Sequence, residues 1–247
     1  MNPFKKDGKS VSIFITAGYP EKESLAVQLL SLQKQGIDFI EIGIPFSDPL
    51  ADGPVIQETS TTALKNGMNL NLLFEQLSEI RKEIYIPLVL MSYLNPILQF
   101  GEDLFLEQCK ATGISGVIIP DLSFELVQNK YRSSFGSGKI PLIYLITPTT
   151  PDSRISQIAQ VSSDAFIYLV GQNKITGSFY SLSDHAKRYS ELKQLCDDVP
   201  LFLGFGISTD EQKKEAFQYV DGIIVGTAYL RALSQGTERK FIEKLRS

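Results

Sequence analysis

The sequence is poor in the residues that build metal sites and disulfides. It contains a single histidine, His185, and two cysteines, Cys109 and Cys196, which lie far apart along the chain. One histidine excludes multi-histidine metal sites, although a hydrolase triad stays possible on paper. The two cysteines form no metal-ligand spacing, and without an export signal we expect them to be reduced thiols. Acid–base chemistry, if the chain performs any, therefore falls to carboxylates.

The chain also lacks the charge clusters and long apolar runs that mark several protein classes. Its formal net charge is −4, and its lysines and arginines are scattered, unlike the basic face of a nucleic-acid-binding protein. No apolar run approaches the ~20 residues of a membrane-spanning helix. The N-terminal stretch MNPFKKDGKS is charged, with no apolar region or cleavage pattern after it. We therefore expect a cytoplasmic protein that binds neither nucleic acid nor membranes.

Short β-rich runs alternate with segments of helical periodicity along the 247 residues, of which 43% are hydrophobic. The runs are almost continuously apolar, which is typical of parallel strands covered on both faces. The expected strands are 11–16, 37–43, 86–92, 115–120, 140–146, 165–170, 200–205 and 221–226. Helices are expected from Leu25 to a stop at Gly36, from Leu70 through Leu77, and near 103–112, 124–135, 152–161, 185–196, 209–218 and 237–246.

This alternation predicts a single-domain (β/α)8 TIM barrel over residues 1–247, with a short N-terminal extension. Helical crossovers indicate parallel pairing, and eight such units in about 250 residues fit a barrel better than an open doubly wound sheet. The open sheet is the second interpretation, because periodicity alone does not exclude it. In a barrel, the active site lies at the C-terminal ends of the strands and in the loops that follow.

Glu41 is the first residue that this rule selects. It stands between Ile40 and Ile42 in an apolar strand, where a carboxylate is costly unless something requires it. Because side chains alternate along a strand, Glu41 shares a face with Phe39 and Gly43. If that face is the barrel interior, Glu41 points into the mouth, with Gly43 leaving space above it. Burial would raise its pKa and suit it to proton transfer; the alternative is a structural ion pair with another strand.

Three aspartates also follow predicted strands. Asp48 and Asp52 lie in the loop after the second strand, ahead of Pro54, which could open a short helix. Asp121 directly follows the fourth strand and could simply begin the next helix. Each aspartate, taken alone, is as well explained as a turn or capping residue.

Three glycine-containing segments follow the last strands: ITG at 175–177, GFGIS at 204–208 and VGTA at 225–228. Glycines let backbone N–H groups approach an anion, and barrels often bind phosphate after strands seven and eight. Singly, Gly204, Gly206 and Gly226 are better explained as tight turns; together they favour a phosphate site. No lysine or arginine is adjacent, so we expect the cradle to be mainly backbone.

The stretch IEIGIPFSDPLADGPVIQ at 40–57 resembles the signature of the tryptophan synthase alpha chain family. Other motifs occur in the family's order: FITAGYP, LMSYLNPI, VIIPDL, LITPTTPDSRI, ITG, LGFGIS and DGIIVGTA. The resemblance covers nearly the whole chain, although the segment before FITAGYP is shorter than usual. It implies a retro-aldol lyase that cleaves indole-3-glycerol phosphate into indole and glyceraldehyde 3-phosphate.

The resemblance also implies roles for individual residues. Glu41 matches the catalytic glutamate that moves protons between the glycerol hydroxyl and indole C3, and Asp52 matches the aspartate that binds the indole N–H. Residues placed around the substrate are Phe14, Met91, Tyr93, Ile118, Leu145, Tyr168, Thr176 and Phe205. Residues placed at the phosphate are Gly177, Gly206, Gly226 and Thr227.

The same resemblance implies a partner, the tryptophan synthase beta chain, in an alpha2-beta2 heterotetramer. Indole would pass to that chain for L-tryptophan synthesis. The beta chain carries pyridoxal phosphate, whereas the alpha chain needs no cofactor or metal. Loop positions matched to the contact or its signalling are Pro45, Phe46, Asp48, Pro49, Asn95 and Asp121.

Two alternatives are open at this point. A Schiff-base aldolase would need a lysine within a strand, and none of the expected strands has one. In the loop after strand six, the family usually has serine at the position of Gly171 and glycine at that of Lys174. The simpler explanation is neutral drift of the loop, since loops tolerate substitution. Because closing loops complete many active sites, the departure also suggests a second hypothesis: a catalytically weakened alpha chain that mainly activates the beta chain.

Overall fold

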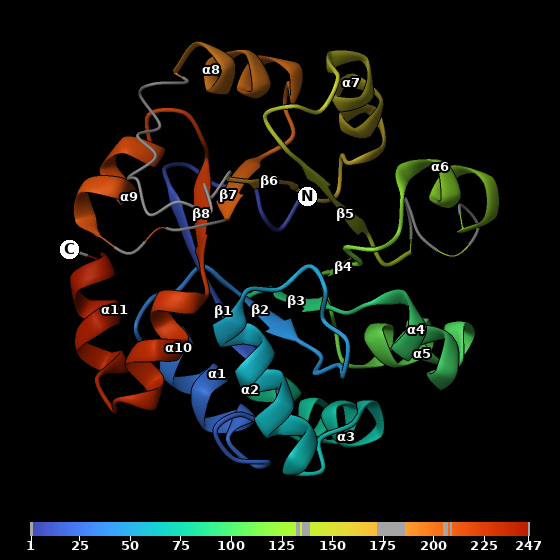
Figure 1. Ribbon diagram of the computed structural model, residues 1–247, viewed down its shortest axis with the longest axis vertical. Helices are drawn as coiled ribbons and strands as arrows, with labels where there is room; N and C mark the ends of the chain where they lie inside the picture. The colour runs from blue at the N-terminus through green and yellow to red at the C-terminus, as the bar shows by residue number, and fades with distance from the viewer. Residues whose placement is uncertain are drawn as a thin grey trace.

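The computed structural model describes residues 2–131, 134, 139–171, 186–204, 207 and 209–246. In these ranges, eight parallel strands close into a barrel, with each strand paired to the next and β8 paired to β1 (Figure 1). The strands are β1 Ser10–Thr16, β2 Phe39–Gly43, β3 Leu88–Met91, β4 Gly116–Ile118, β5 Leu142–Ile146, β6 Ile167–Val170, β7 Leu201–Gly204 and β8 Gly222–Val225. The predicted barrel is confirmed, and the open sheet is excluded.

Helices surround the barrel (Figure 1). They are α1 Leu25–Lys34, α2 Pro54–Lys65, α3 Leu70–Ile80, α4 Leu94–Phe100, α5 Glu102–Ala111, α6 Phe124–Leu126, α7 Asp152–Val161, α8 Ala186–Leu195, α9 Asp210–Ala216, α10 Thr227–Ser234 and α11 Glu238–Arg246. A 3-10 turn, η1, follows α3 at Arg81–Glu83, and a π-helical segment, η2, follows α6 at Val127–Tyr131. The short helix expected at Pro54 continues through Lys65 as α2, and α4 and α10 were not predicted.

The predicted helices form where their apolar stripe meets the barrel. Leu25, Leu29 and Leu32 of α1 are buried against it, and Gly36 ends that segment with φ 78°, a conformation that favours glycine. In α3, the Asn69 side chain accepts a hydrogen bond from the Leu72 N–H and caps the helix. These stripes and the outward faces of the strands make up the larger of the two cores.

The barrel interior contains the smaller core. At the N-terminal ends of the strands, the Phe4 ring packs on Phe39 and Phe166, and Phe202 packs on the same two rings, with centroids 4.8 to 5.3 Å apart. The N-terminus lies inside the ring of helices (Figure 1), so Phe4 closes this end of the barrel. A cavity lies at the other end of the barrel, and Glu41 and Tyr168 are among its lining residues.

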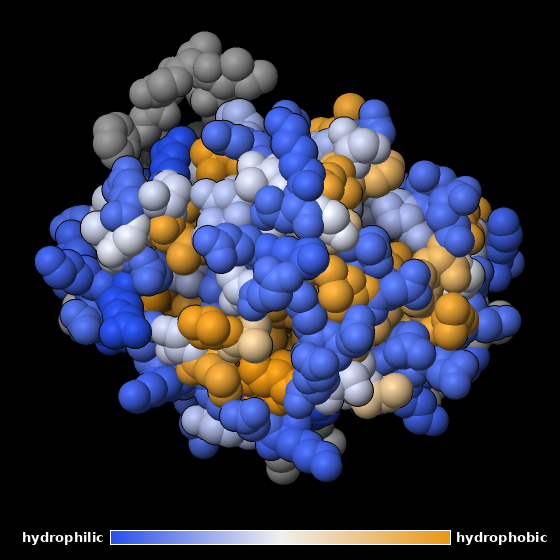
Figure 2. Space-filling model, turned by 90° about the horizontal axis from the view of Figure 1, so that it is seen from below, coloured by the Kyte–Doolittle hydropathy of each residue, from blue (hydrophilic) through white to orange (hydrophobic). Residues whose placement is uncertain are grey.

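The face that carries α1, α2 and α3 is mostly polar, with apolar side chains between the charged ones (Figure 2). None of the helices in the described ranges is long and apolar enough to cross a membrane.

Candidate active site

Glu41 lies inside the barrel, as its alternation with Phe39 predicted. Its side chain is 1% exposed, and its Oε2 has no hydrogen-bond partner among the described residues. No basic side chain pairs with it there, so the alternative of a structural ion pair is wrong for the described residues. The space left by Gly43 is not open: a Cβ built on Gly43 would lie 2.4 Å from the ring of Phe14. Gly43 thus admits the Phe14 ring beside Glu41.

Burial controls the charge of Glu41. Loss of hydration disfavours its carboxylate, and the nearby Asp52 adds like-charge repulsion, so the pKa of Glu41 rises to about 8. Glu41 is therefore mainly protonated at neutral pH. A group with such a pKa can both give and take a proton near pH 7.

Asp52 reaches the same site from the loop between β2 and α2. It does not cap α2, whose N-cap is Gly53 with Pro54 in the first turn. Instead, its Oδ2 accepts a hydrogen bond from the Tyr93 hydroxyl at 3.0 Å. Burial raises the pKa of Asp52, and this hydrogen bond opposes the rise. The capping interpretation is therefore wrong, whereas the backbone of Asp52 does lie in a turn, its N–H donating to the Pro49 carbonyl at 3.0 Å.

A cavity of about 360 Å³ opens at the C-terminal ends of the strands. Both acids line it, together with apolar side chains and the first turn of α10. The lining residues are Phe14, Glu41, Asp52, Gly53, Pro54, Val55, Ile56, Met91, Tyr168, Ile207, Ile224, Gly226, Thr227, Ala228 and Arg231. This cavity has the composition of a small-molecule site, an apolar wall with a few polar groups.

Arg231 is the charged residue of the cavity lining that the sequence did not reveal. It lies on α10, four positions after Thr227, so both side chains share one face of that helix. Gly226 is the N-cap of α10 and provides no side-chain cap, which leaves first-turn N–H groups available to an anion. The prediction of a mainly backbone cradle did not include this arginine, which lines the same cavity as Gly226 and Thr227. The i, i+4 spacing was the available signal.

The other predicted substrate contacts divide into three groups. Phe14, Met91 and Tyr168 line the cavity. Tyr93, Ile118 and Leu145 do not: Ile118 is packed in the inner core, Leu145 packs against it, and Tyr93 lies behind Asp52. Thr176, Gly177, Phe205 and Gly206 lie outside the described residues, as do Lys174 and His185.

Gly204 and Gly171 fix the backbone where β6 and β7 end. A Cβ on Gly204 would lie 1.9 Å from the Tyr168 hydroxyl, so Gly204 makes room for that side chain rather than for a ligand alone. The Gly171 N–H donates to the Gly204 carbonyl at 3.1 Å.

Asp121 has a role that its place in the sequence did not suggest. It does not begin the helix after β4, because Ser123 caps α6. Its carboxylate accepts a hydrogen bond from the Leu94 N–H at 2.9 Å and so caps α4, which follows the neighbouring strand. Nearby, the Phe46 ring packs on the Tyr93 ring with centroids 5.2 Å apart. Asp48 is exposed, and its carboxylate accepts a hydrogen bond from Ser47.

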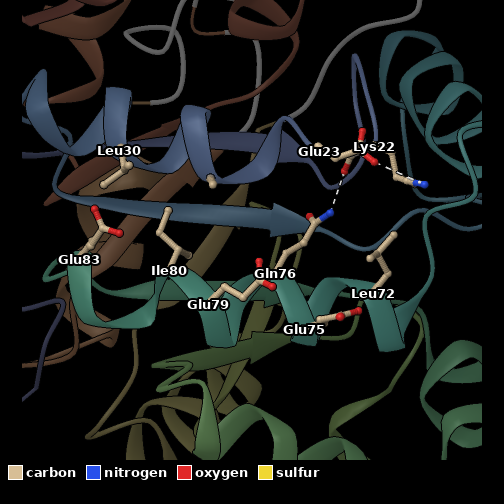
Figure 3. A pocket seen from close by; sticks show the side chains of 10 residues that line it. Lys22, Glu23, Leu30, Leu72, Glu75, Gln76, Glu79, Ile80 and Glu83 are labelled. Carbon is tan, nitrogen blue, oxygen red and sulfur yellow. Dashed lines mark hydrogen bonds and ion pairs between the residues drawn. The ribbon is translucent and has the colours of Figure 1, made fainter.

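A second hollow, of about 470 Å³, lies outside the barrel between α1 and α3 (Figure 3). Apolar side chains such as Leu30, Leu72 and Ile80 line it. Its acidic residues are Glu23, Glu75, Glu79 and Glu83. Lys22 is the one basic residue among the described residues that line it, and it pairs with Glu23 at 3.4 Å. This acidic groove repels an anion, and no strand end contributes to it. Among the described residues, no group of side chains is arranged to hold a metal ion.

The chain matches the family described as tryptophan synthase alpha chain over residues 2–246. The tryptophan synthase alpha chain of Christiangramia forsetii is 44% identical over 247 residues, which cover 98% of this chain and 96% of that one. The relative from Phocaeicola vulgatus, of the same name, is 45% identical over 240 residues, with 95% and 92% covered. A crystal structure of the alpha chain from Legionella pneumophila superposes with a TM-score of 0.81 at 30% identity, covering 99% of this chain and 93% of that chain.

Proposed function

We propose a function on the premise that this chain belongs to the tryptophan synthase alpha chain family. It is a carbon–carbon lyase that cleaves indole-3-glycerol phosphate to indole and glyceraldehyde 3-phosphate, as the alpha subunit of a tryptophan synthase. The observation that carries the proposal is the cavity at the strand ends, which brings two acids together with a helix N-terminus and an arginine.

The reaction makes specific demands on the site. Breaking the bond between indole C3 and the glycerol carbon sends its electron pair into the indole ring, which must first be protonated at C3. The glycerol hydroxyl loses its proton as the aldehyde forms. One proton enters and one leaves, so a single carboxyl group that changes protonation state can serve both steps.

Glu41 has the properties for that exchange. With a pKa of about 8 it holds a proton at neutral pH and can donate it to C3. The resulting carboxylate, buried and without a hydrogen-bond partner on Oε2 among the described residues, is then a base for the hydroxyl proton. Activity should accordingly fall as pH rises past about 8, because Glu41 then loses its proton before the substrate can take it.

Asp52 supports the ring while it carries positive charge. Its carboxylate lines the cavity and can accept the indole N–H, and its negative charge stabilises the cation formed by protonation at C3. Phe14, Met91 and Tyr168 supply the apolar wall for the ring. The phosphate belongs with Gly226, Thr227 and Arg231, where N–H groups and a guanidinium favour an anion. Thr176, Gly177, Phe205 and Gly206 are proposed for the substrate on the resemblance alone.

We infer a partner for the mouth of the barrel: a beta chain that carries pyridoxal phosphate, receives indole for L-tryptophan synthesis and completes an alpha2-beta2 heterotetramer. Leu50 in the loop after β2 is 91% exposed, and Leu98 on α4 is 47% exposed, although both are apolar. They lie beside Pro49 and Asn95, which the resemblance assigns to the contact. Apolar side chains gathered near polar ones are typical of a docking surface. Pro45, Phe46, Asp48 and Asp121 complete the proposed contact.

We further propose that residues 1–247 act as one domain in the cytoplasm. One closed barrel and one continuous outer core support the first statement.

The test is indole release from indole-3-glycerol phosphate, with and without the cognate beta chain. Glu41→Gln is the variant, and Glu58→Gln, an exposed glutamate on α2, is its matched control. The proposal is supported if indole release rises with the beta chain, persists in Glu58→Gln and disappears in Glu41→Gln. No release by the wild type, alongside faster beta-chain turnover of supplied indole, would instead establish a partner-activating chain.

A further inference from the structure

Tyr93 contacts one of the two proposed catalytic acids, Asp52, from outside the cavity. It follows β3, precedes α4, and is 6% exposed, yet it does not line the cavity. Its hydroxyl accepts a hydrogen bond from the Ala51 N–H at 2.8 Å and donates one to Asp52 Oδ2 at 3.0 Å. A residue that touches Asp52 but not the cavity acts on a substrate through that carboxylate.

The Ala51 bond fixes the direction of the Asp52 bond. A phenol has one proton to donate, and a backbone N–H can only donate. Because the Ala51 N–H points at the phenol oxygen, the phenol proton is directed to the carboxylate. Asp52 is thus an acceptor at Oδ2, which favours its ionised form.

The charged and titratable groups around Asp52 show why the Tyr93 hydroxyl matters for the ionisation of Asp52. Asp52 faces Glu41 from β2 and Tyr168 from β6, and Arg231 of α10 lines the same cavity. Burial raises the pKa of Asp52, and the Tyr93 hydrogen bond is the contact that lowers it. The charge kept on Asp52 in turn helps to raise the pKa of Glu41. One hydroxyl therefore separates the protonation states of the two acids.

The backbone holds Tyr93 in this place. The neighbouring Leu94 N–H donates to Asp121 at 2.9 Å, and the Phe46 ring packs against the Tyr93 ring at an interplanar angle of 33°. The loop after β4 thus holds the backbone next to Tyr93, and the loop after β2 contacts both its ring and its hydroxyl. These contacts limit rotation of the side chain.

We propose that Tyr93 is a positioning residue: by donating to Oδ2 it keeps Asp52 ionised and turned towards the cavity, and so keeps Glu41 as the proton donor. This role rests on the proposed lyase function. It replaces the direct substrate contact that the resemblance implied for Tyr93.

The test is Tyr93→Phe, which keeps the ring and removes the hydroxyl. We expect kcat for indole release to fall about tenfold at pH 7 with little change in KM, because a hydrogen bond to a charged group is lost at a residue outside the cavity wall. The acidic limb of the pH–rate profile should move to higher pH, since Asp52 then ionises less readily. In an Asp52→Asn background, Tyr93→Phe should have almost no further effect. Tyr144→Phe, a buried tyrosine on the outer side of β5, is the matched control.

The titration of Asp52, followed by carbon NMR of labelled aspartate carboxyls, provides a readout without substrate. An upward shift in Tyr93→Phe supports the positioning role even if the wild type releases no indole, in which case only the lyase proposal fails. Three results would overturn the role: an unchanged Asp52 titration, an equal loss of kcat in the Asp52→Asn background, or a raised KM with unchanged kcat, which would mark Tyr93 as a substrate contact.

Discussion

The two ends of the barrel interior differ in whether their side chains have packing, hydrogen-bond and ion-pair partners. At the N-terminal ends of the strands, Phe4 closes a cluster of aromatic rings, and the carboxylates just outside it pair with lysines, as Lys193 does with Asp221 at 2.6 Å. At the C-terminal ends, Glu41 is buried with Oε2 unpartnered among the described residues, beside a second acid and an open cavity. One end is built for stability, whereas the other keeps a destabilising group in place for chemistry.

At the C-terminal end, Asp52→Asn is expected to lower turnover strongly without lowering stability. Removing the charge that supports the protonated ring should lower kcat by about a hundredfold to a thousandfold, while the fold stays intact. Steady-state indole release measures it, with Asp103→Asn on the exposed face of α5 as the matched control. Full turnover in Asp52→Asn would remove Asp52 from the mechanism.

At the N-terminal end, a substitution at Phe4 is expected to lower stability without lowering turnover. Phe4→Ala leaves a gap beside two rings and should lower the free energy of unfolding by about 3 kcal/mol, with kcat per folded molecule unchanged. Urea unfolding gives the first quantity and active-fraction-corrected turnover the second. Phe4→Leu, which refills most of the gap, should cost less than half as much. A loss of kcat without a loss of stability would contradict the division between the ends.

A substitution at Arg231 tests whether this residue helps to bind the substrate phosphate. Arg231→Met keeps the apolar stem but removes the charge, so KM for indole-3-glycerol phosphate should rise about tenfold with kcat nearly constant. Arg239→Met, an exposed arginine on α11, is the control. The same change should weaken inhibition by inorganic phosphate. If KM and phosphate inhibition were unaltered, the phosphate would be bound by backbone N–H groups without Arg231.

The smallest effect is expected from an ion pair at the N-terminal end. Lys193 and Asp221 are each about one-third exposed, at 35% and 33%, so Lys193→Met should cost less than about 1 kcal/mol of unfolding free energy. Asp221→Asn should cost more, because Asp221 also accepts a hydrogen bond from the Leu201 N–H. Equal losses in urea unfolding would show that the ion pair alone matters.

The parts of this molecule that sequence predicts well are those with local signals. The strands were recognisable because buried parallel strands are continuous apolar runs, and Glu41 because it interrupts one of them. The helix α2 was underestimated because its buried face includes Thr59 and Ser60, so the apolar periodicity is missing. The cap of α4 is not local at all, since Asp121 comes from the loop after the next strand.

The site residues that escaped prediction depend on three-dimensional placement. Arg231 reaches the cavity only because α10 begins at its edge, and Gly43 gives space to Phe14, which is far away in sequence. The Tyr93 hydroxyl could be assigned to Asp52 only once the loops after β2 and β3 were seen together. Chemistry that depends on such pairs cannot be read from spacing along one chain.

One pair of measurements on Glu41→Gln tests the central claim, that this acid is held protonated for catalysis at a cost in stability. The folded-state pKa of about 8 lies above the ordinary value of 4.5, so the wild type loses stability as pH rises between these values, and glutamine does not. Relative to wild type, the variant should gain roughly 3 kcal/mol in urea unfolding between pH 5 and pH 8, while indole release falls by about a thousandfold. A pH-independent difference in stability together with retained indole release would contradict the claim.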